Sequence, residues 1–195
     1  THLLYVTNAG NVTVIDGNTD QISETISVSS GHLTSMAVNP STNRIYVSDI
    51  LDNHIFVLDS NDNTLISKIQ VGKNPDGIAI NTNTNTIYVA NSGDGSVSVI
   101  DGNTNTVTDN VAAGTHVFAI AVNPISGVVY TANDSPGILY AISGTGKSNQ
   151  NDIKCEGGTL DEKGVCVLDK ESKSSGCLIA TASYETELAP QVQLL

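Results

Sequence analysis

Hydrophobic residues along this chain occur in runs of four to six, rich in β-branched side chains and bounded by clusters of Asn, Asp and Gly. This pattern predicts short strands joined by tight turns. In one stretch we expect strands near 77–81, 86–91, 96–101 and 106–111. Because the turns between them are short, these four strands are expected to pair as one antiparallel sheet.

The same pattern returns about every 42 residues. The tetrapeptide Tyr-Val-Thr-Asn or a variant of it begins at Tyr5, Tyr46, Tyr88 and Tyr130, which are 41, 42 and 42 residues apart. Two other short elements, an Ala-Val-Asn-Pro type and a Val-Ile-Asp-Gly type, keep the same spacing. A four-stranded antiparallel unit of this length is the blade of a β-propeller, so we predict an all-β propeller.

The repeat resembles the YVTN family of β-propellers over residues 1–143. The resemblance rests on Tyr5-Val6-Thr7-Asn8 and, in the later repeats, on Val71-Gly72, Pro75 and Gly77-Ile78-Ala79. This family is common among archaeal surface-layer and secreted proteins, and related propellers include several enzymes. The resemblance therefore implies the architecture and leaves the function open.

The strand count predicts about three and a half blades. The first blade begins at its second strand, and the fourth has strands near 117–122, 128–133 and 138–142 before the pattern ends. Three arrangements would cover the exposed edges and faces: the tail closes a four-bladed ring, copies complete one another in a ring or filament, or the chain is a segment of a longer propeller. We expect copies to share strands or blade faces, with the tail helping.

The composition changes after Gly144, where five of the eight basic residues are found. We interpret residues 144–153 as a linker and 154–195 as a separate segment that contains all three cysteines. Cys155 and Cys166 flank Gly-rich turns and predict a disulfide-clasped hairpin, since a module this small needs a covalent bridge. Their spacing matches no common zinc site.

Cys177 begins the sequence Cys177-Leu178-Ile179-Ala180-Thr181. This segment resembles the Cys-Phe-Ile box at the C-termini of archaeal exported proteins, with Leu178 in place of Phe. The resemblance implies export to the cell surface or the medium. An alternative interpretation is an amphipathic helix over 189–195 that packs on the propeller. An odd cysteine in an exported protein also suggests an intermolecular disulfide.

Charge and hydropathy exclude two classes of partner. The net charge is −12, so the chain repels phosphate backbones, and we expect no nucleic acid partner. No apolar run reaches the 18 residues of a membrane-spanning helix, so we predict no transmembrane segment.

The candidate chemistry of the turns and loops is sparse. Asp59, Asn61 and Asn63 place oxygen ligands at alternating positions, as at the start of a calcium loop, although Asx residues also simply form good turns. His32 and His116 precede the innermost strands of their blades, where we favour solvated turn histidines over metal ligands. The triplets that start at Asn11 and Asn133 are N-glycosylation sequons.

No catalytic constellation stands out, so we predict a protein that is not an enzyme and needs no cofactor, calcium being the one candidate. Our first hypothesis is an exported structural protein of the cell surface or extracellular space that associates with copies of itself and with other surface proteins or glycans. The alternatives are a ligand- or glycan-binding propeller and a metal-dependent hydrolase or lactonase-like propeller.

Overall fold

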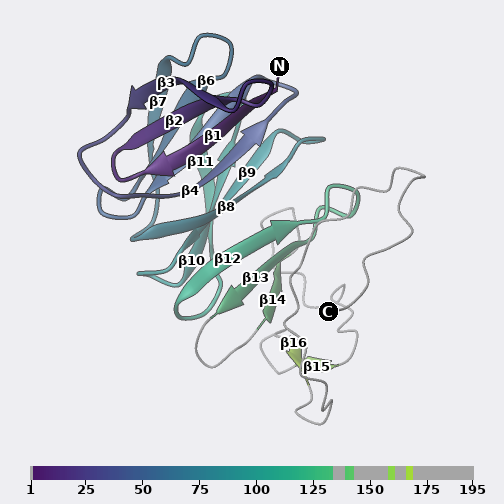
Figure 1. Ribbon diagram of the computed structural model, residues 1–195. Coiled ribbons are helices and arrows are strands. Elements are labelled where there is room, and N and C mark those ends of the chain that lie inside the picture. Colours follow the sequence, from purple (N-terminus) through teal and green to yellow (C-terminus); the bar gives the residue numbers. More distant parts are fainter. Residues whose placement is uncertain (1, 134–138, 143–157, 161–165, 169–195) are drawn as a thin grey trace, which may run out of the picture.

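In the computed structural model, the described residues are 2–133, 139–142, 158–160 and 166–168, and they form four antiparallel sheets, which we call blades 1 to 4 (Figure 1). Blade 1 contains β1 (Leu3–Asn8), β2 (Asn11–Asp16) and β3 (Gln21–Ser27). Blade 2 contains β4 (Leu33–Asn39), β5 (Arg44–Asp49), β6 (His54–Asp59) and β7 (Leu65–Gln70). Blade 3 contains β8 (Pro75–Asn81), β9 (Thr86–Asn91), β10 (Ser96–Asp101) and β11 (Thr106–Ala112).

Blade 4 contains β12 (Val117–Val122), β13 (Val129–Asn133) and β14 (Leu139–Ile142), followed in the sheet by β16 (Cys166–Leu168) and β15 (Gly158–Leu160). The prediction of four-stranded antiparallel blades is thus confirmed. The strands expected in the third repeat begin and end within two residues of those in blade 3.

The turns explain why the sequence is so rich in asparagine. Between the first two strands of blades 2 and 3, Asn43 and Asn85 adopt left-handed backbone conformations with φ of 53° and 51°. Between the last two strands, Asn63 and Asn105 do the same, with φ of 59° and 55°. Asparagine accepts this conformation more readily than most residues, so the polar clusters fix where each strand ends.

Each blade has two faces that pack on different neighbours. The first, which we call the tyrosine face, carries the tyrosine of the repeated tetrapeptide and packs on the following blade. The second, the aliphatic face, carries the residues on either side of that tyrosine and packs on the preceding blade. In the cluster between blades 2 and 3, for example, Tyr46 and Val57 contact Ile87 and Val89, and all four are at most 0% exposed.

The blades follow one another in an arc, with β1 contacting β4, β4 contacting β8, and β8 contacting β12. Blades 1 and 4 lie at opposite ends of the described part of this arc (Figure 1). In blade 1 the strand β1 occupies the place that β5 and β9 hold in blades 2 and 3, and no described strand pairs with its other edge. The innermost strand is therefore absent from blade 1, as the sequence predicted.

At the other end, the structure differs from the predicted strand count. The sequence pattern ended blade 4 after three strands, whereas β16 lies beside β14 with Leu139 opposite Cys166. The outer strand of this blade is thus supplied by the segment 154–195. A three-residue strand so far along the chain carries no repeat signal, which is why the pattern did not reveal it.

No helix among the described residues is long and apolar enough to span a membrane.

Candidate functional site

The last residue of the repeated tetrapeptide is buried and organises the loop that leads into the inner strand of its blade. In blade 2 this residue is Asp49, which is 0% exposed. Its carboxylate accepts hydrogen bonds from the Ser29 hydroxyl and from the N–H groups of His32, Leu51 and Asp52, at 3.1, 3.0 and 3.1 Å for the three N–H groups. Burial alone would raise the pKa of Asp49, but these donors hold it below its ordinary value.

Asparagine plays the same part in blade 4. The side-chain amide of Asn133 donates to the carbonyl oxygens of Ala113 and Thr115, at 3.1 and 2.6 Å, and Asn133 is 5% exposed. A glycan on this amide nitrogen would require both hydrogen bonds to break. Asn11, the other sequon, is the first residue of β2 and is only half-buried. Glycosylation stays a prediction at both positions, and the geometry favours Asn11.

The calcium candidates form a hydrogen-bonded turn. The Asp59 carboxylate accepts from the backbone N–H and the side-chain amide of Asn61, both at 2.9 Å, and from the Arg44 guanidinium at 2.6 Å. The Asn61 N–H and the Arg44 charge hold the pKa of Asp59 below its ordinary value. The equivalent turns at Asp16 and Asp101 close in the same way, with the N–H of the residue two positions later at 2.8 Å.

Asn63, the third calcium candidate, is engaged with blade 1 instead. Its amide nitrogen donates to the Glu24 carboxylate at 2.7 Å, and its carbonyl oxygen accepts from the Tyr5 hydroxyl at 3.2 Å. Nowhere in the described residues do three or more His, Cys, Asp or Glu side chains gather as a metal site would need. Calcium binding at Asp59, Asn61 and Asn63 stays a prediction without further support.

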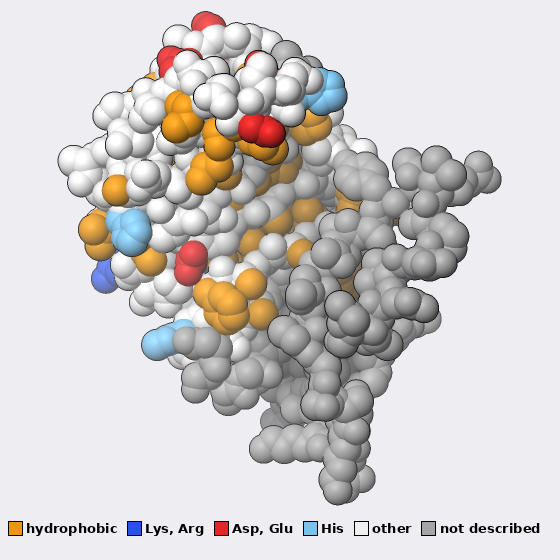
Figure 2. All heavy atoms as spheres, viewed as in Figure 1, with side chains coloured by type: hydrophobic (Ala, Val, Ile, Leu, Met, Phe, Trp, Pro, Cys, Tyr) orange, Lys and Arg blue, Asp and Glu red, His pale blue; other side chains and the backbone are white. Residues whose placement is uncertain are grey.

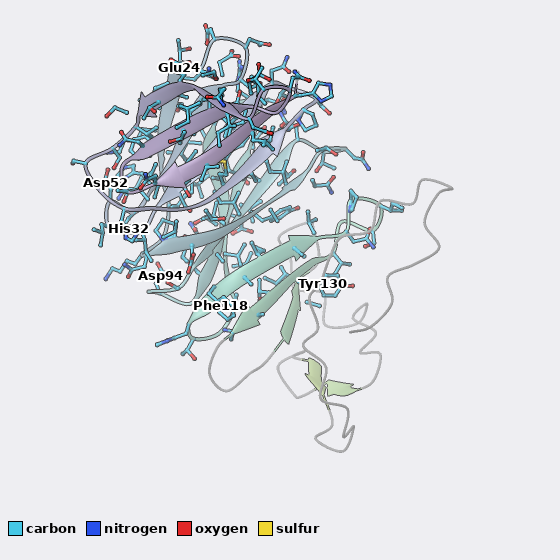
Figure 3. The ribbon with its side chains drawn as sticks, viewed as in Figure 1. Glu24, His32, Asp52, Asp94, Phe118 and Tyr130 are labelled. Atoms are coloured by element: carbon cyan, nitrogen blue, oxygen red, sulfur yellow. The ribbon has the colours of Figure 1, made fainter. Side chains whose placement is uncertain are left out.

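The two histidines lie in corresponding loops, as predicted. His32 and His116 are exposed and directly precede β4 and β12 (Figure 3). Cys155 and Cys177 lie outside the described residues, and of Cys166 only the backbone is described. The Cys155–Cys166 disulfide and the intermolecular role of Cys177 therefore stay predictions.

An open hollow of about 460 Å³ lies between the loop 28–31 and blade 2, lined by Phe56 and Lys68 among others. The Lys68 ammonium is 2.6 Å from the Asp52 carboxylate and 5.4 Å from the centre of the Phe56 ring. The lysine charge is thus already paired, and Phe56 is only 4% exposed. Sequence analysis missed this hollow because its residues come from separate elements and share no motif.

The largest departure from the repeat is at the two ends of the arc. In blade 1, Leu4 and Val6 on the aliphatic face are 55% and 47% exposed, whereas their counterparts in blade 2, Ile45 and Val47, are both 0% exposed. Hydrophobic side chains gather on the viewed surface where blade 1 lies (Figure 2). These side chains are in the positions that bury each blade, but nothing among the described residues packs on them.

The blade 4 end shows the same deficit on the other kind of face. Tyr130 on β13 is 40% exposed, whereas Tyr46 and Tyr88 at the same repeat position are 0% and 3% exposed (Figure 3). Sequence analysis anticipated apolar end faces without naming their residues. Aligning the repeats on the tyrosine identifies them, because neighbours of the tyrosine alternate between the two faces.

No family model and no curated protein matches the chain. Among solved structures, Kuenenia stuttgartiensis hydrazine synthase is similar at 22% sequence identity with a TM-score of 0.68, over 73% of this chain and 43% of that one. Dihydro-heme d1 dehydrogenase NirN in complex with DHE is similar at 16% identity with a TM-score of 0.62, over 76% of this chain and 33% of that one. The chain thus spans less than half the length of either. These similarities, with the four repeated sheets, show that the chain has the β-propeller fold.

Proposed function

We propose that this chain is an exported, non-enzymatic β-propeller that works as a self-assembling structural protein outside the cell or at its surface. The observation that carries the proposal is the pair of uncovered apolar faces at the ends of the arc. Leu4 and Val6 at one end and Tyr130 at the other are each at least 40% exposed in positions that are buried between blades.

Energetics favour covering these faces. Burying one leucine, valine or similar side chain contributes roughly 1.5–3 kcal/mol relative to leaving it in water. Beside them, β1 presents an edge without a partner strand among the described residues, and such an edge is a template for pairing with another chain. A second copy of the chain supplies both an apolar face and strands, so self-association satisfies both requirements.

The proposed location rests on resemblance. The repeat resembles the YVTN propellers of archaeal surface-layer and secreted proteins, and the segment that starts at Cys177 resembles the C-terminal box of archaeal exported proteins. Glycans at Asn11 and a disulfide between Cys155 and Cys166 belong to the same proposal, because both require export. Other surface proteins or glycans are the expected partners besides copies of the chain.

The two alternatives have less support in the described residues. The hydrazine synthase and the dehydrogenase are enzymes by name, but identities of 22% and 16% extend the similarity to the fold alone. For a ligand- or glycan-binding propeller, the hollow beside Phe56 offers neither an exposed aromatic ring nor an unpaired charge. We therefore adopt neither alternative.

Fractionation of the source cells tests the location. Detection of the chain with a specific antibody is expected in the envelope or the medium, and peptides from that material are expected to carry a glycan at Asn11. Detection only in the cytosolic fraction would contradict the export part of the proposal. Light scattering on the purified chain is expected to give a dimer or larger assembly.

A further inference from the structure

All the contacts between blades in the described residues join unlike faces. Between blades 1 and 2, Tyr5 and Val12 of the tyrosine face pack on Ile45 and Val47 of the aliphatic face. Between blades 2 and 3 the same arrangement brings Tyr46 against Val89. Blades 3 and 4 follow the rule as well, with Tyr88, Ala79 and Ala90 against Val129 and Ile142. No two faces of the same kind meet at these three interfaces.

The two ends of the arc expose one face of each kind. Blade 1 presents its aliphatic face, with Leu4 and Val6 in the positions that Ile45 and Val47 hold in blade 2. Blade 4 presents its tyrosine face, with Tyr130 in the position of Tyr88. The ends are therefore complementary, since each is one half of the contact that already occurs three times within the chain.

The blade 4 face also repeats the composition of a face whose partner is known. On blade 3, Tyr88 is flanked by Ala79 on β8 and by Ala90 on β9, and this surface receives the aliphatic face of blade 4. On blade 4, Tyr130 lies opposite Ala121 on β12 and is followed on its own face by Ala132. The same three residue types in the same places predict that this surface also receives an aliphatic face.

We infer that copies of this chain associate head to tail, the tyrosine face of blade 4 of one copy packing on the aliphatic face of blade 1 of the next. This inference rests on the proposed self-assembly and specifies its contact. A head-to-tail contact is heterologous, so it generates a closed ring where the rotation closes and a filament where it does not. A symmetric contact between two blade 1 faces or two blade 4 faces would have no precedent in the chain.

Trans-complementation between two variants tests the inference. Val6→Glu places a charge on the blade 1 face, and Tyr130→Glu places one on the blade 4 face. Each variant alone is expected to be monomeric by light scattering, because each head-to-tail contact needs both faces. An equimolar mixture is expected to form a dimer of one copy of each and nothing larger, since one intact face of each kind is left.

A matched control and a milder variant complete the experiment. Ile125 is 87% exposed outside both faces, so Ile125→Glu is expected to assemble like the unmodified chain. Thermal melts establish that the variants are folded. If Val6→Glu is not, Val6→Thr keeps a β-branched side chain on β1 and is expected to weaken association about tenfold.

The outcomes separate the contact from the assembly itself. A chain that assembles, but of which one variant still forms a dimer alone and gains nothing on mixing, would overturn the head-to-tail contact and leave self-assembly standing. An unmodified chain that stays monomeric at every concentration would contradict self-assembly as well. A dimer that forms only on mixing supports both.

Discussion

Asp49 stands where two other copies of the repeated tetrapeptide, in blades 3 and 4, carry Asn91 and Asn133. The tetrapeptide was recognisable in the sequence, but its last residue offered no sign of its task. The structure shows that this residue is buried and holds the loop before the inner strand, with Asp49 accepting four hydrogen bonds and Asn133 donating two. A partner some 20 residues earlier in the chain leaves no local pattern, so only the structure could reveal it.

Replacing Asp49 tests this task. Asp49→Ala is expected to lower the free energy of unfolding by about 2–3 kcal/mol, because the donors around it lose their acceptor in a buried place. Asp49→Asn, the residue of blades 3 and 4, keeps one acceptor oxygen and is expected to cost less. Urea denaturation of both variants measures the difference, and equal stabilities would contradict the structural task.

The same carboxylate makes stability depend on pH. Its pKa in the folded state lies below that in the unfolded state, so its contribution to stability is complete above the unfolded pKa and is lost as the pH falls through the folded pKa. Between about pH 5 and pH 2 the unmodified chain is therefore expected to lose more stability than Asp49→Asn. Parallel slopes of stability against pH for the two proteins would contradict this assignment.

The predicted disulfide also belongs to the residue scale. Cys155 and Cys166 are expected to be bonded in native material, because the Gly-rich segment between them is too small to fold without a bridge. Mass mapping of unreduced peptides checks the bond. Two free thiols at these positions would refute it.

At the scale of elements, the sequence predicted strands well and edges poorly. Strands in blade 3 lie where they were expected because left-handed Asn residues such as Asn85 and Asn105 mark the turns. The pairing of β16 with β14 escaped prediction, since β16 has three residues and lies outside the repeat. The close approach of adjacent inner strands was likewise invisible, although Gly77 in the sequence is its signature.

Gly77 gives an element-scale prediction. A Cβ at this position would lie 2.6 Å from the Phe118 carbonyl oxygen on β12, so Gly77→Ala must push two inner strands apart. We expect a loss of about 1–3 kcal/mol in the free energy of unfolding, as for other overpacked sites. Ser35→Ala, at the same repeat position in blade 2, is the control and is expected to change stability little. Equal losses for both variants, measured in urea, would show that the strands are not so close.

At the scale of the whole molecule, two properties oppose each other. The net charge of −12 makes copies repel, while the uncovered faces around Val6 and Tyr130 favour contact between them. The sequence predicted the open arc from the strand count alone. The complementarity of its ends depended on which side chains share a face, and this became visible only when exposure could be compared between blades.

Salt is therefore expected to strengthen assembly. Raising the ionic strength from about 0.01 M to 0.15 M shortens the screening length from roughly 30 Å to 8 Å and weakens repulsion between acidic copies. Contact between apolar faces is not weakened by the same change. Sedimentation at both ionic strengths checks the direction, and an assembly that dissociates with added salt would indicate that ion pairs hold the copies together.

The most direct test of the account is the mass of the unmodified chain in solution as a function of concentration. The monomer has a mass of 20.3 kDa. Light scattering or sedimentation at low micromolar concentration is predicted to give a dimer or a larger assembly, which shifts toward the monomer on dilution. A compact, stable monomer at every concentration would contradict the claim that copies of this chain cover one another's end blades.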